Sequence, residues 1–77
     1  MDIRRMLLNG RYGDAVRIHG KKTVCDELES MAYHDMADHA LMAAHSLGYT
    51  DIARSIAPIV RNSGAYGTQA NEIARKY

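Results

Sequence analysis

The chain has 77 residues, of which 47% are apolar and 25% charged, with a net charge of +1. This length allows one domain over residues 1–77, because two hydrophobic cores need more chain. The composition excludes a wholly disordered protein. No run of 18 apolar residues exists, residues 1–10 lack the apolar stretch of a secretory signal, and the single cysteine, Cys25, fits a reducing compartment. We therefore expect a cytoplasmic protein without a membrane partner.

Charge is strongly segregated along the chain. Residues 1–22 carry six basic and two acidic side chains, residues 23–51 carry six acidic and no Lys or Arg, and residues 52–77 are again basic. Two interpretations remain open. The basic ends either fold over the acidic middle and neutralise it, or each segment presents a charged face to a partner of opposite charge.

The N-terminal third predicts two different elements. Residues 2–9 form a short helix in this interpretation, and Gly10 ends it. Residues 12–24 contain two glycines, and Val16 and Ile18 alternate there with polar side chains. This pattern is typical of a loop or a short β-hairpin, in which residues 15–18 pair with residues 23–24.

The central segment, residues 24–47, predicts one long helix. Thr23 is a suitable N-cap, no Gly or Pro interrupts the segment, and Gly48 follows as a left-handed cap. About 24 residues at 1.5 Å each give a helix about 36 Å long. The predicted fold is therefore mainly α, with one long central helix and a possible short β-hairpin near residues 12–24.

Two shorter helices are predicted after Gly48. Thr50 caps the first, whose apolar stripe packs on the long helix as an αα-hairpin, and Pro58 is expected to kink or split it near Ala57. Thr68 caps the last helix, which extends to Lys76.

A helical projection of the long helix divides it into two faces. The core face is predicted to carry Cys25, Ala32, Met36, Ala40, Ala43 and Leu47, with Leu28 and His39 just outside it. The opposite, outward face mixes acidic, histidine and large apolar side chains, namely Glu27, Met31, His34, Asp38, Leu41, Met42 and His45. It can be an ordinary solvated face, a partner-binding surface, or the pH-sensitive seam of a homodimer.

The histidines and carboxylates of this face do not predict a metal site or a catalytic centre. His34 and Asp38 lie one helical turn apart, but Asp38 and His45 lie about 10 Å apart along the axis and cannot share an ion. Cys25 is predicted on the core face, where cysteine usually serves as a small apolar side chain. We therefore expect no enzyme, no metal and no cofactor.

A second candidate surface is basic, and it contains Arg11, Tyr12, Arg17, Lys21 and Lys22. It could contact phosphates and stack on a base, so a small nucleic-acid-binding protein is an alternative. The preferred hypothesis is a non-catalytic protein-binding module, such as a regulator, inhibitor or adaptor, that occupies the surface of another protein. A self-associating helical structural protein, and hence a homo-oligomer, is the second alternative.

Overall fold

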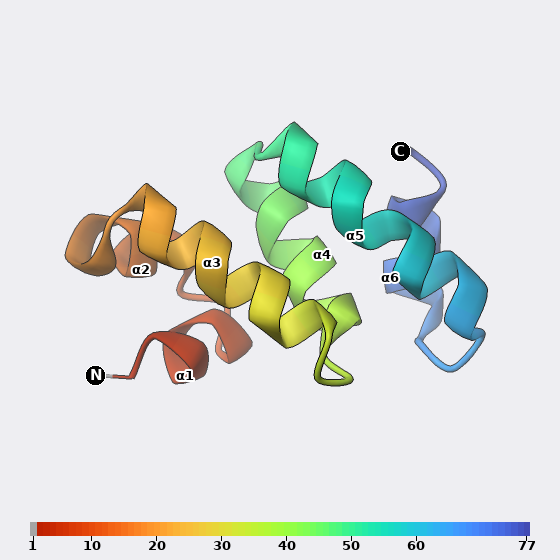
Figure 1. Cartoon of the computed structure of the whole chain (residues 1–77), viewed down its shortest axis with the longest axis horizontal. Helices are drawn as coiled ribbons and strands as arrows, with labels where there is room; N and C mark the ends of the chain where they lie inside the picture. The colour runs from red at the N-terminus through yellow and green to blue at the C-terminus, as the bar shows by residue number, and fades with distance from the viewer. Residues whose placement is uncertain (1) are drawn as a thin grey trace.

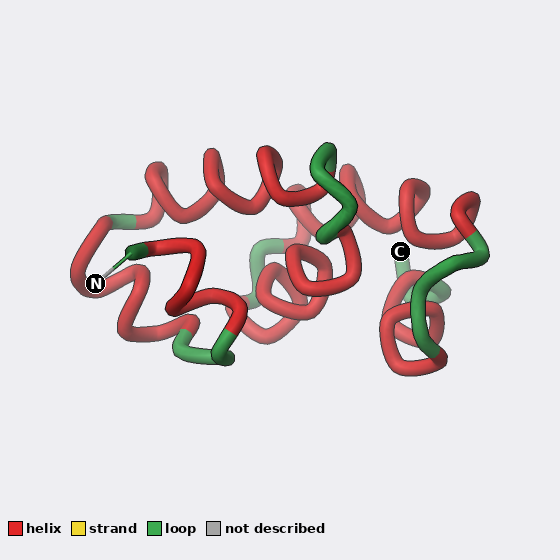
Figure 2. Tube along the Cα trace, turned by 90° about the horizontal axis from the view of Figure 1, so that it is seen from below, coloured by secondary structure: helices red, strands yellow, loops and turns green. Residues whose placement is uncertain are grey.

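The computed structural model describes residues 2–77, which form six helices and no strand (Figures 1 and 2). The helices are α1 (Ile3–Leu8), α2 (Tyr12–His19), α3 (Lys21–Ala32), α4 (Ala37–Leu47), α5 (Thr50–Ser63) and α6 (Thr68–Ala74). The mainly helical class is therefore confirmed. No helix within residues 2–77 is long and apolar enough to cross a membrane.

Helix α4 is the centre of the molecule. It contacts each of the other five helices, with α3 and α5 side by side over it, α1 and α2 at one end and α6 at the other (Figure 1). Five of its residues are buried, namely Ala37, Ala40, Leu41, Ala43 and Ala44. The four alanines have small side chains, which allow close approach of the neighbouring helices.

The β-hairpin expected near residues 12–24 is wrong, because this segment forms α2 and the start of α3. Ala15 is buried and Tyr12, Val16 and His19 are half-buried, so the inward positions follow the helical repeat. The alternation around Val16 covers too few residues to distinguish a strand from one helical turn. Gly20, with φ 89° and ψ 154°, separates the two helices.

The predicted long helix is divided in two. Helix α3 ends at Ala32, residues 33–36 turn the chain, and α4 begins at Ala37. Asp35 adopts φ 63°, and it is the one non-glycine residue within residues 2–77 with a positive φ. A straight helix of about 36 Å would exceed the longest dimension of the molecule, 32 Å. Because the chain turns, α3 packs against α4 instead of extending it.

The C-terminal half follows the predictions more closely. Gly48 has φ 76° and ψ 20°, the expected left-handed cap, and α4 and α5 pack together as the predicted αα-hairpin. Helix α5 continues through Pro58 and is not split there. Proline removes one backbone hydrogen-bond donor, and the burial of Ile56, Ala57 and Val60 in the core outweighs this loss. Thr68 is the first residue of helix α6 and not its N-cap, which is Gly67, and the helix ends earlier than predicted, at Ala74.

Candidate functional site

The first predicted surface is not a face of the folded molecule. Met31 and Leu41, two of its three large apolar members, are 0% exposed and belong to the hydrophobic core. The prediction that they face outward is therefore wrong. The reason is the turn at residues 33–36. Because of this turn, α3 and α4 do not share one helix axis, and each directs a different side toward the core.

The other members of this first surface are mostly engaged within the fold. Glu27 accepts a hydrogen bond from Nε of Arg4, so it holds α1 against α3. Nδ1 of His45 lies 2.6 Å from the Tyr77 hydroxyl, and the two rings meet edge to face. Asp38 and Met42 are half-buried on α4. The exposed member, His34, bonds through Nδ1 to the Ser30 carbonyl oxygen at 2.6 Å.

The second predicted surface is more accessible, and its charges are largely paired locally. Asp14 accepts hydrogen bonds from Arg17 at 3.0 Å and from Arg11 at 3.0 and 3.2 Å, which holds the pKa of its carboxyl below the usual value. Lys22 bonds to Asp26 at 3.0 Å one turn along α3. Tyr12 is half-buried and packs against the core.

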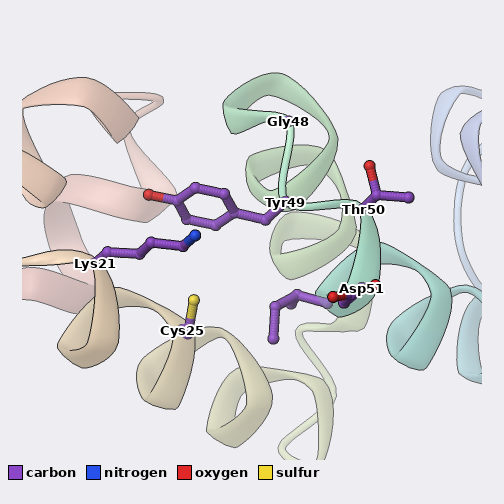
Figure 3. A pocket seen from close by; sticks show the side chains of 7 residues that line it. Lys21, Cys25, Gly48, Tyr49, Thr50 and Asp51 are labelled. Carbon is purple, nitrogen blue, oxygen red and sulfur yellow. The ribbon is translucent and has the colours of Figure 1, made fainter.

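Lys21 differs from these neighbours. Its ammonium lies over the Tyr49 ring, 5.0 Å from the centroid, and forms no ion pair with a carboxylate of residues 2–77. The Lys21 side chain extends from α3 toward this ring, and the Cys25 thiol points toward the end of the Lys21 side chain (Figure 3). A cation above an aromatic face is stabilised by the ring quadrupole, so this contact joins α3 to the α4–α5 turn.

An open cavity of about 400 Å³ adjoins this contact, and we call it the Lys21 cavity. It is lined by Lys21, Cys25, Gly48, Tyr49, Thr50, Asp51 and Ile52. Cys25, Tyr49 and Ile52 are half-buried and supply apolar surface, while Lys21 and Asp51 place one charge of each sign at the rim. Burial raises the pKa of the Cys25 thiol, and Asp26 and Glu29 raise it further against the opposing effect of Lys21.

The cavity combines one predicted site residue with several that the sequence did not single out. Lys21 belongs to the predicted basic surface, whereas Tyr49 and Ile52 belong to neither of the two predicted surfaces. Lys21 and Tyr49 lie 28 positions apart, so no local pattern signals their contact. Chemically, the cavity can receive an apolar group together with a charged group at its rim.

Residues 2–77 contain no cluster of three or more His, Cys, Asp or Glu side chains able to hold a metal ion. Comparison with protein-family models, with curated proteins and with solved structures gives no match. The properties of the described residues are therefore the basis for a functional proposal.

Proposed function

We propose that this chain is a non-catalytic protein-binding module of the cytoplasm, a small regulator, inhibitor or adaptor, and that its contact surface is the Lys21 cavity. The observation that supports the proposal is the open cavity, whose half-buried Cys25, Tyr49 and Ile52 can cover an apolar side chain of a partner. Partner proteins commonly anchor one side chain in such a pocket, surrounded by a polar rim.

The charge of Lys21 favours a partner segment that carries a carboxylate beside its apolar anchor. Arg17 and Lys22 already bond to Asp14 and Asp26, whereas among residues 2–77 Lys21 has only the aromatic ring of Tyr49 opposite its ammonium. A partner carboxylate at Lys21 would form a charge-assisted hydrogen bond, which is stronger than a neutral one. Asp51, across the cavity, would repel a second carboxylate and so orient the segment.

The test compares the exposed neighbours Lys21 and Lys22. Tagged wild type, Lys21→Glu and Lys22→Glu proteins are used to capture partners from a native lysate, with and without nuclease, and any captured protein is then titrated in purified form. Both substitutions change the charge equally in the first turn of α3, so they form a matched pair. We expect Lys21→Glu to weaken binding roughly tenfold or more, because it replaces attraction by repulsion at the cavity, and Lys22→Glu to change it little.

Four results would contradict the proposal. Equal losses in both variants would indicate a diffuse basic surface, and loss of capture after nuclease treatment would favour the nucleic-acid alternative. Binding that falls steeply with salt would support the same alternative, because neutralised phosphates release counterions. Binding of one protein that neither variant weakens would place the contact elsewhere on the molecule.

A further inference from the structure

The turn between α3 and α4 lacks glycine and proline, the residues that usually end a helix. Residues 33–36 are Tyr, His, Asp and Met, so neither glycine nor proline interrupts the helical pattern of residues 21–47. The turn requires φ 63° at Asp35, a left-handed conformation that costs free energy for a residue with a Cβ atom. Aspartate tolerates it better than most residues, which makes the turn accessible without making it obligatory.

The alternative conformation of this segment is a helix. If residues 33–36 took helical dihedral angles, α3 and α4 would join into one helix over residues 21–47, about 40 Å long. That length exceeds the 32 Å longest dimension of the folded chain, so the α1–α3 half would swing away from the α4–α6 half. Core residues of both halves, among them Leu28, Met31 and Leu41, would then lose their cover.

We propose that two copies of this chain exchange halves through this hinge and form a domain-swapped dimer. In the dimer, residues 33–36 are helical and the α1–α3 half of each copy packs on the α4–α6 half of the other. A second copy is the occupant that fits, because it supplies the same core contacts that the closed chain makes within itself. Short hinge connections with a disfavoured conformation are known to promote such exchange.

The swap has a consequence for the Lys21 cavity. Lys21 and Cys25 belong to the α1–α3 half, whereas Tyr49 and Ile52 belong to the α4–α6 half. Each cavity of the dimer is therefore built from two copies, and the dimer carries two cavities. The proposal itself does not depend on the function of that cavity, since it stands on the hinge and the two halves of the core.

The test changes the preference of the hinge at Asp35. Wild type, Asp35→Gly and Asp35→Ala are unfolded in urea, refolded at high concentration, and measured by size-exclusion chromatography with light scattering. Glycine accepts the left-handed turn and favours the monomer, whereas alanine favours the helix. We expect the association constant to rise from Gly through Asp to Ala, by roughly tenfold or more per hinge between the extremes. The control is Asp26→Ala, an equal charge change at an exposed position within α3, which should leave the constant unchanged.

A second measurement distinguishes a swapped dimer from two closed chains side by side. Dimers are prepared from a mixture of isotope-labelled and unlabelled wild-type chains, and isotope-filtered NMR then detects contacts between copies. The swapped dimer places the Lys21 side chain of one copy near the Tyr49 ring of the other, a contact that closed chains make internally. Wild type that stays monomeric after refolding, or a dimer without this intermolecular contact, would overturn the proposal. Because wild type carries this measurement, unfolding of Asp35→Ala does not weaken the test.

Discussion

Leu41→Ala is the substitution that best tests whether Leu41 lies in the core of the molecule or on its surface. Leu41 is 0% exposed on α4, the helix that contacts every other helix. Truncating a buried leucine removes transfer free energy and leaves a cavity, which together cost about 2–5 kcal/mol. A chain of this length is expected to have a free energy of unfolding of about 4–12 kcal/mol. The substitution therefore removes a large fraction of the stability and lowers Tm by about 10–30 °C.

The assay for Leu41→Ala is urea and thermal unfolding followed by circular dichroism. The matched control is Tyr33→Ala, which truncates a side chain that is 79% exposed in the α3–α4 turn and should change the free energy of unfolding by no more than about 0.5 kcal/mol. Leu41→Ala protein with the stability of wild type would refute the assignment of this residue to the core. Tyr33→Ala with the larger loss would do the same.

Three further predictions concern local features. The pKa of Asp14 is lowered by hydrogen bonds from Arg17 and Arg11, so the stability that Asp14 contributes is present above its unfolded pKa and is lost as pH falls through the folded pKa. Asp14→Asn should therefore lose less stability in acid than wild type does. An unchanged acid unfolding curve would contradict this. Because burial raises the pKa of Cys25, its thiol should react with Ellman's reagent at pH 8 more slowly than in urea-unfolded protein, and equal rates would refute this. Gly48→Ala should cost about 1–2 kcal/mol in urea unfolding, because alanine is strained at φ 76°. Apart from its two chain neighbours, no atom of residues 2–77 lies within 4 Å of the added Cβ, so a clash does not contribute to this cost. The matched control is Gly13→Ala, which has equal space and no positive φ.

The sequence predicted the αα-hairpin because its signals are local. Gly48 ends one helix, and the apolar stripe that contains Ile52, Ile56 and Val60 defines the inward side of the next. Each signal acts within a few residues of the structure that it determines. For the same reason, the left-handed cap at Gly48 could be predicted without knowledge of the tertiary fold.

The division of the long helix could not be predicted in this way. Nothing local to residues 33–36 breaks a helix, and the turn exists because α3 must pack against α4 to bury both. The sequence did contain one signal of the turn. Met31 and Leu41 are large apolar residues on the face that was expected to be solvent-exposed, and apolar residues on every side of a helix indicate that it is buried. The two errors, a continuous helix and an exposed Met31, thus have one cause.

The candidate site was predictable only in part. Lys21 and Lys22 look equivalent in the sequence, and their difference arises because Tyr49, far along the chain, lies beneath one ammonium while Asp26 bonds to the other. Contacts between distant segments depend on how the helices cross, which a single sequence does not state. The basic character of this region was therefore evident, whereas the cavity was not.

The central position of α4 determines how the protein exchanges its amide hydrogens. Helix α4 contacts all five other helices, so when any one of them detaches, the others still shield the backbone of α4 from water. The interior amides of α4 therefore exchange only when the whole chain unfolds. Exchange at Ala43 and Ala44 therefore measures the same free energy as denaturant unfolding. Amides near the ends of α1 and α6 can exchange through local fraying, at lower free energy, so the protection pattern decreases from the middle of the sequence toward both termini.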